Sequence, residues 1–435
     1  MESREAAMTL AQELHEEIQQ IKIIDTHEHL VNRQMLSDMG FNIIHAMEIE
    51  YVKDSLLAVG IDPNLLVQGG FQTDNLLDQV IPVLWKVRNT SYYRSLFRAF
   101  RDLHGLQGEE LDRRNLKRVS DSIESAYARR DWYEQVLQKK CNIRYILRDM
   151  EYMPIEHDFI RPVIRMDNFL MLRHRRLLQD WIERGAPIFT LRVSEYDYTN
   201  TVKTFTDYLD LLESHFQEAQ TFGAIAVKVG IAYNRTLYFE QVSQDEAFRI
   251  FALPDEKTTE SDIKAFQDFM MFRIIEKAAE YRLPVQIHTG LLSAGKNRLG
   301  NTNPLLLTDV FLQFPEVRFD LFHGGFPFTG ETGALALMFP NVYLDTCWLP
   351  IISEMTFKRA LKEWLCSVPA SKILWGGDCA CAEGTYGAVA TMQEALAAVL
   401  AEKIEEDVLD FESAVWTAKG ILHDNAEELF GLKAP

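Results

Sequence analysis

The stretch "IKIIDTHEH", residues 21–29, decides the fold prediction because it is a short apolar run that ends in two histidines. Similar runs rich in Val, Ile and Leu recur along the chain, and longer segments of helical character separate them. Continuous apolar runs suit strands that are buried on both faces, as in a parallel sheet or barrel. The eight runs predict an α/β fold of the (β/α)₈ TIM-barrel type; the other seven are "NIRYIL" (142–147), "RPVIR" (161–165), "AIAVKVG" (224–230), "PVQIH" (284–288), "RFDLFH" (318–323), "NVYLD" (341–345) and "KILWGGD" (372–378).

The spacing of the runs predicts one barrel domain over residues 1–435 with a helical insertion at 36–140. This insertion shows apolar residues at helical spacing and turn signals, and it follows the first strand. Such a position lies on the carboxyl-end face of a barrel, so we expect the insertion to act as a lid. A ninth run, "PIFTLRV" at 187–193, is assigned to a loop insertion.

Composition and charge narrow the functional classes. The 64 acidic residues outnumber the 45 basic ones, and the resulting net charge of -19 argues against nucleic acid as a partner. No apolar run is long enough to span a bilayer, and the N-terminus lacks the pattern of a secretory signal, so we expect no membrane association and a cytoplasmic location. The five cysteines are an odd number at irregular spacing, which predicts reduced thiols.

Candidate metal ligands lie at the ends of four predicted strands. Side chains alternate across a strand, so His27 and His29 share a face with Asp25, which could orient a histidine, whereas Glu28 points the other way. An H-x-H pattern alone also suits two hydrogen-bonded histidines without a metal. Further polar residues at strand ends favour a metal, zinc or else manganese or iron, with an open position for water; they are His288, His323 and Asp378.

The type and order of these residues resemble the amidohydrolase superfamily of metal-dependent barrels. The surrounding words "HTG", "FHGGFP" and "GGDC" are similar to its amidohydrolase 2 group, and in particular to the amidohydrolase-like part of nodulin/glutamine-synthetase-like proteins. The resemblance covers the first strand and residues 220–430 and is loose over the insertion. It implies one divalent metal, bound by His27, His29, His288 and Asp378, with Asp378 and His323 as catalytic residues.

Four further residues are predicted to bind the substrate. Some superfamily members carry a carboxylated lysine that bridges two metals, and Lys228 stands on the corresponding strand; we favour one metal and assign Lys228 to an anionic substrate group. Arg235 is a second candidate, with a solvated loop arginine as the alternative. In the insertion, Tyr92 and Arg94 are predicted lid contacts, although Arg94 and Arg98 one turn further also suit a solvated helix face. The histidines away from strand ends, His104 and His215 among them, are interpreted as surface or capping residues.

The predicted reaction is hydrolysis of an amide, ester or lactone bond in a small carboxylate-bearing substrate by a metal-activated water. A non-oxidative decarboxylase or a uronate-isomerase-like enzyme acting on a sugar acid would use nearly the same residues. A non-enzymatic module that has kept the barrel is disfavoured because every expected metal position is filled. The habit of the family suggests a homo-oligomer.

Overall fold

The computed structural model describes residues 8–62, 74–108, 111–149, 156–171, 173, 202–293 and 297–432. The ninth apolar run at 187–193 lies outside the described residues. Among the helices of the described part, none combines the length and apolar character needed to cross a membrane.

Eight strands form one sheet whose order is the order of the chain, β1 to β8. The register is parallel for each pair from β3–β4 to β6–β7. The segment after β8 hydrogen bonds to β1, with the Asp378 amide donating to the His27 carbonyl over 2.8 Å and the His29 amide to the Cys379 carbonyl over 2.8 Å. The predicted (β/α)₈ barrel topology is confirmed, and each strand overlaps a predicted run: β1 (Ile23–Glu28), β2 (Ile143–Asp149), β3 (Ile160–Arg165), β4 (Ala226–Val229), β5 (Val285–Ile287), β6 (Phe319–Leu321), β7 (Val342–Asp345) and β8 (Ile373–Leu374).

The chain divides into two compact units that both carry strands of this sheet. Unit 1 comprises Met1–Ile146 and Thr346–Ala426, and unit 2 comprises Leu147–Asp345 and Glu427–Pro435. The boundary runs through β2, so β1, the start of β2 and β8 belong to unit 1, whereas β3 to β7 belong to unit 2.

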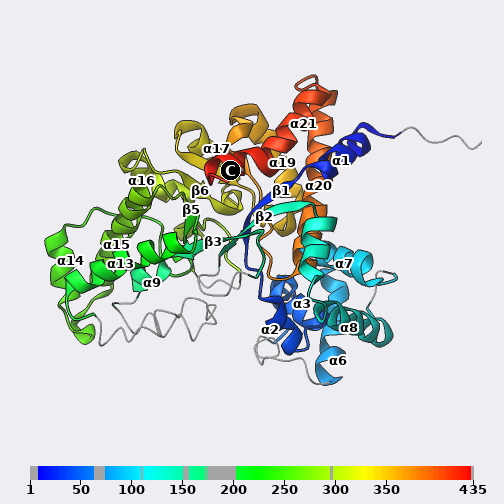
Figure 1. Cartoon of the computed structure of the whole chain (residues 1–435), viewed down its shortest axis with the longest axis horizontal. Coiled ribbons are helices and arrows are strands. Elements are labelled where there is room, and N and C mark those ends of the chain that lie inside the picture. The colour runs from blue at the N-terminus through cyan, green and yellow to red at the C-terminus, as the bar shows by residue number, and fades with distance from the viewer. Residues whose placement is uncertain are drawn as a thin grey trace, which may run out of the picture. The chain divides into compact units, whose positions relative to one another are not determined.

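The predicted insertion between β1 and β2 consists, in its described residues, of helices and the turns that connect them. Its helices, blue to cyan in Figure 1, pack against one another within unit 1. The apolar face of α7, with Leu96, Phe97 and Phe100, is buried, so packing stabilises this helix more than its charged face does. The helices are α2 (Arg33–Asp38), α3 (Ile43–Ile49), α4 (Val52–Ala58), α6 (Asp74–Val87), α7 (Ser91–His104), α8 (Arg113–Tyr127) and the π-helix η1 (Glu134–Lys140).

The remaining helices of unit 1 are α1 (Leu10–Gln20), α18 (Leu349–Ile352), α19 (Glu354–Ser367), η8 (Ala370–Lys372), α20 (Ala382–Glu405), α21 (Phe411–Lys419) and η9 (Gly420–Asp424). α20 is buried along much of its length and packs against α1, α7 and α19. It therefore connects the insertion to the strand end that carries Asp378. The next helix, α22 (Asn425–Leu429), crosses the unit boundary.

In unit 2, helices follow the strands as a barrel requires. The two longest, α13 and α15, each begin with a capping box in which a threonine and an acidic residue three positions later satisfy free backbone amides. All residues of β4, β5 and β6 are buried. The helical elements are α9 (Asp167–Met171), α13 (Phe205–Thr221), η3 (Ile231–Tyr233), α14 (Gln244–Phe251), η4 (Asp255–Lys257), α15 (Glu260–Tyr281), η5 (Leu299–Thr302), η6 (Pro304–Leu307), α16 (Thr308–Gln313), η7 (Phe322–Gly325) and α17 (Thr329–Met338).

Candidate metal centre

Three of the predicted ligands converge in unit 1. Nε2 of His27 lies 3.3 Å from Oδ1 of Asp378, and Nε2 of His29 lies 3.2 Å from the same oxygen. These ligand atoms all lie within 4.8 Å of one another, and His27 and Asp378 are buried. Two imidazole nitrogens and one carboxylate oxygen are donors that suit zinc and other divalent transition metals, so the residues present fit such an ion.

Electrostatics keep the carboxylate of this cluster ionised. Burial raises the pKa of Asp378, but the charges and hydrogen bonds of His27 and His29 outweigh burial and hold this pKa well below its usual range. An ionised carboxylate is the form that binds a cation.

A pair of glycines allows the end of β8 to approach β1. A Cβ atom on Gly376 would lie 2.7 Å from the His27 backbone nitrogen, and one on Gly377 would lie 2.3 Å from a Glu28 carboxylate oxygen. Asp378 follows with a φ of 60°, a left-handed conformation that turns its side chain out of the strand direction. The "GGD" word thus has a steric cause, because side chains on either glycine would separate Asp378 from the two histidines.

Two acidic residues beside the histidines accept hydrogen bonds from the backbone. Oδ1 of Asp25 accepts the backbone amides of His27 and Gly377, at 3.2 and 3.0 Å. Asp25 therefore holds the main chain at His27 on β1 and at Gly377, directly before Asp378. Glu28 accepts the Cys379 amide, and burial, together with the nearby carboxylates Asp25 and Glu50, raises the pKa of Glu28 well above its usual range. A carboxyl group held this way makes a poor ligand. The Glu28 side chain also hydrogen bonds to Asp25, so the two carboxyl groups meet although strand alternation predicts opposite faces.

An aromatic cluster from the insertion reaches the same site. The Tyr51 hydroxyl donates to the Asp378 carbonyl over 2.6 Å. The Tyr51 ring lies 4.7 Å from the Trp348 ring and 5.6 Å from the Tyr92 ring. The predicted lid contact Tyr92 thus packs on the Tyr51 ring, and Tyr51 in turn binds the backbone of Asp378.

In unit 2, the two remaining predicted histidines form a pair. Nε2 of His323 lies 3.0 Å from Nδ1 of His288, and both side chains are buried. The second nitrogen of His288 lies 2.8 Å from the Leu291 carbonyl, so His288 would exchange one of these hydrogen bonds to bind an ion. His323 has a φ of 64° directly after β6, and the Tyr233 ring lies 4.6 Å from the His288 ring.

Lys228 lies one layer deeper in the sheet than these histidines. The register pairs Lys228 with Gln286, two residues before His288, and Gln286 with Asp320. Nζ of Lys228 lies 3.4 Å from the centre of the Phe322 ring, and the side chain is 1% exposed. A cation placed over a ring face is stabilised by the ring quadrupole, so the Phe322 ring can stabilise a charged Lys228.

Arg235 is held by residues of its own unit. NH1 lies 2.6 Å from Asp268, NH2 donates to the Tyr238 carbonyl over 2.6 Å, and Nε donates to the Thr236 carbonyl over 2.9 Å. All three guanidinium nitrogens are thus engaged. The arrangement favours a structural role and gives little support to substrate binding.

The Arg235→Ala variant is expected to lose stability and keep its affinity for substrate. It removes a charged hydrogen bond to Asp268, which is 1% exposed, so we expect the free energy of unfolding to fall by about 1–3 kcal/mol. Urea unfolding measures this loss, and Arg249→Ala is the control because its ion pairs are half exposed. A raised KM at unchanged stability would show that Arg235 binds substrate instead.

The last predicted contact, Arg94, forms an ion pair with Glu354 of α19 and is 55% exposed. It lines a pocket with other arginines of α7, and that pocket includes none of His27, His29 or Asp378. The structure therefore does not bring Arg94 into the metal cluster.

Sequence reasoning missed Tyr51 and Trp348 and misjudged two histidines. Trp348 follows β7, so its place near a strand end was a usable signal, whereas nothing in the local sequence marked Tyr51. The surface or capping interpretation is wrong for His104 and His215, which are buried. Nε2 of His104 lies 2.9 Å from a buried carboxylate of Glu383 on α20, so it ties α7 to α20.

Comparison with known families covers the part of the chain that holds His288, His323 and Asp378. The family model for Amidohydrolase matches residues 210–432, slightly more than half of the chain. The chain belongs to the Amidohydrolase family. Protein fluG of Emericella nidulans is 34% identical to this amidohydrolase over 158 residues, which are 36% of this chain and 18% of that relative. The chain thus spans less than a fifth of the curated relative that it matches.

Solved structures share the fold of this amidohydrolase along its length. The uronate isomerase from Thermotoga maritima has a TM-score of 0.75 at 17% identity, with 97% of each chain covered. A Lactobacillus casei protein provisionally described as a metal-dependent hydrolase has a TM-score of 0.66 at 18% identity, with 96% of this chain and 97% of that chain covered. At these identities the likeness shows the fold alone.

Proposed function

We propose that this amidohydrolase is a metal-dependent hydrolase that cleaves an amide, ester or lactone bond in a small carboxylate-bearing substrate. The observation that carries the proposal is the convergence of the His27 and His29 Nε2 atoms on one oxygen of the ionised Asp378. Membership of the family supports an enzymatic role, and the matched residues 210–432 include Asp378.

The proposed ligand set is His27, His29 and Asp378, with His288 as the fourth ligand. We propose one divalent ion, zinc in the first place and manganese or iron as alternatives. Such an ion, when bound, lowers the pKa of a coordinated water toward neutrality and polarises a carbonyl group.

We assign acid–base work to Asp378 and His323. Asp378 is buried beside His27 and His29 and is our candidate for accepting a proton from the attacking water. His323 is held by its hydrogen bond to His288, so its ring has a fixed orientation for donating a proton to the leaving group. Tyr51 fixes the Asp378 backbone and acts as a positioning residue.

Two residues are proposed to contact the acidic substrate. Lys228 is a buried cation and remains our candidate for balancing the charge of a substrate carboxylate, and Tyr92 remains the candidate lid contact. The name of the uronate isomerase indicates an acidic sugar as its substrate, which is consistent with this class.

Metal removal and restoration test the proposal. Chelation is expected to abolish turnover of a panel of lactones, esters and N-acyl amino acids bearing a carboxylate, and added Zn²⁺ or Mn²⁺ to restore it. Because an ion that binds only the folded state stabilises it, restoration should also raise the melting temperature. A protein that takes up no divalent ion, and whose melting temperature added metal does not change, would contradict the proposal.

The same assay separates the alternatives by product. The fold likeness to uronate isomerase suggests one alternative, isomerisation of a uronate, which NMR detects as a new carbonyl position without uptake of water. Release of carbon dioxide from an aromatic or unsaturated acid would show a decarboxylase. Metal-dependent turnover confined to either of these reactions would keep the metal centre and overturn hydrolysis.

A further inference from the structure

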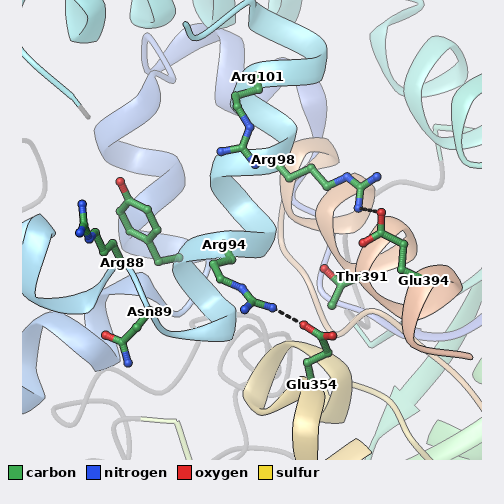
Figure 2. A pocket seen from close by; sticks show the side chains of 9 residues that line it. Arg88, Asn89, Arg94, Arg98, Arg101, Glu354, Thr391 and Glu394 are labelled. Atoms are coloured by element: carbon green, nitrogen blue, oxygen red, sulfur yellow. Dashed lines mark hydrogen bonds and ion pairs between the residues drawn. The ribbon is translucent and has the colours of Figure 1, made fainter. Parts of the chain in front are cut away.

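A pocket of about 490 Å³ lies beside α7 in unit 1 and contains a concentration of arginines. Figure 2 shows that Arg94, Arg98 and Arg101 project from one side of α7, with Glu354 and Glu394 opposite. A fourth arginine, Arg88, comes from the turn before α7. The volume falls within the range of small-molecule sites.

The arginines share one helix face because of their spacing. Arg94, Arg98 and Arg101 stand four and three residues apart, which places them one above the other along the helix. Like charges at this spacing repel one another unless something balances them.

Carboxylates balance only part of this charge. Arg94 pairs with Glu354, and Arg98 pairs with Glu394 over 2.6 Å and with Asp102 over 3.5 Å. Within the described parts of the chain, no carboxylate pairs with Arg101, or with Arg88, which lies over the Trp85 ring.

The two ion pairs also hold half of the pocket in a fixed arrangement. Glu354 is anchored in turn by Lys358 and by its backbone amide, which donates to Ser91 at the start of α7. Arg94 and Arg98 are therefore oriented before any ligand arrives, whereas the guanidinium groups of Arg88 and Arg101 remain available. Guanidinium groups suit the planar, bidentate recognition of carboxylates and phosphates.

We propose that this pocket is a binding site for a small anion with two or more negative charges, separate from the metal centre. Four arginines against two lining glutamates leave a local positive surplus in a chain whose net charge is -19. The anion carries phosphoryl or carboxylate groups that contact the arginines lining the pocket, Arg88 and Arg101 among them. The alternative is that these arginines are an ordinary solvated helix face. Such a face would not require a pocket, nor Arg88 of the preceding turn as part of its lining.

Calorimetric titration of the full-length, metal-loaded protein with pyrophosphate and with tricarballylate tests the proposal, at an ionic strength fixed with KCl. We expect saturable binding of one anion per chain, weakened about tenfold or more by Arg101→Gln and by Arg88→Gln. The control Arg129→Gln changes an exposed, paired arginine of the same unit and should leave binding unchanged. Tighter binding of one probe over the other identifies the phosphoryl or the carboxylate class.

The His27→Ala variant separates this site from the metal centre. Both probes can chelate divalent ions, so binding that disappears in His27→Ala and persists in Arg101→Gln would place the anion at the metal and overturn the proposal. The absence of saturable binding by either probe would also overturn it. Binding that survives His27→Ala and is lost in Arg101→Gln supports it, whether or not the protein is a hydrolase.

Discussion

The His27→Ala variant is expected to lose its divalent metal and, with it, all metal-dependent turnover. His27 is buried and supplies one of two imidazole nitrogens directed at Asp378, so the remaining His29 and carboxylate would hold an ion poorly. Loss of an outer partner costs metal affinity about 10–100-fold, and loss of a direct ligand should cost more. Metal content after dialysis, measured by mass spectrometry, gives the result.

The matched variant is His323→Ala. We assign His323 to proton transfer, so this variant should retain nearly one ion per chain while losing activity. His288→Ala should fall between the two, because His288 keeps hydrogen bonds to Leu291 and His323 in the structure. If His27→Ala kept its metal while His323→Ala lost it, the assignment of ligands and acid would have to be reversed.

The Gly290→Ala variant is expected to be strongly destabilised. Gly290 has a φ of 75°, and a Cβ atom there would lie 2.2 Å from the Phe326 carbonyl oxygen and 2.7 Å from the Gly325 carbonyl carbon. The left-handed conformation alone costs an alanine roughly 1–2 kcal/mol, and the backbone clash adds overpacking of about 1–3 kcal/mol. We expect the free energy of unfolding in urea to fall by about 3 kcal/mol or more.

Gly300→Ala serves as the comparison, because a Cβ atom there meets nothing within 4 Å and φ is not positive. Its stability should be unchanged or slightly higher, since alanine restricts the unfolded chain. Equal stability of the two variants would show that the segment after β5 adapts freely. The tight backbone conformation at Gly290 would then not be what holds His288 in place.

The sequence predicted the strands well because buried parallel strands are continuous apolar runs, a pattern that does not depend on distant residues. For the same reason the strand ends "HEH" and "GGD" identified the histidines and the aspartate that converge in unit 1. These strand ends can be recognised from the local sequence because they need particular residues. A glycine such as Gly377 is required where two backbones come close, and the left-handed residue Asp378 follows it directly.

The insertion was predictable only as helical. Tyr51 binds the Asp378 carbonyl from a position 327 residues earlier, and His104 pairs with Glu383 from 279 residues earlier. Such partners are set by tertiary packing, which helical spacing does not encode. The same limit applies to Arg235. Its ion pair with Asp268 of α15 depends on how the loop after β4 packs, which the local sequence does not encode.

Anomalous diffraction at the metal absorption edge, from crystals grown with Zn²⁺, tests the central claim most directly. The account predicts one strong peak per chain at bonding distance, about 2.0–2.2 Å, from His27 Nε2, His29 Nε2 and an Asp378 carboxylate oxygen. A map with no peak beside these three residues, in crystals of protein that had been given the metal, would contradict it.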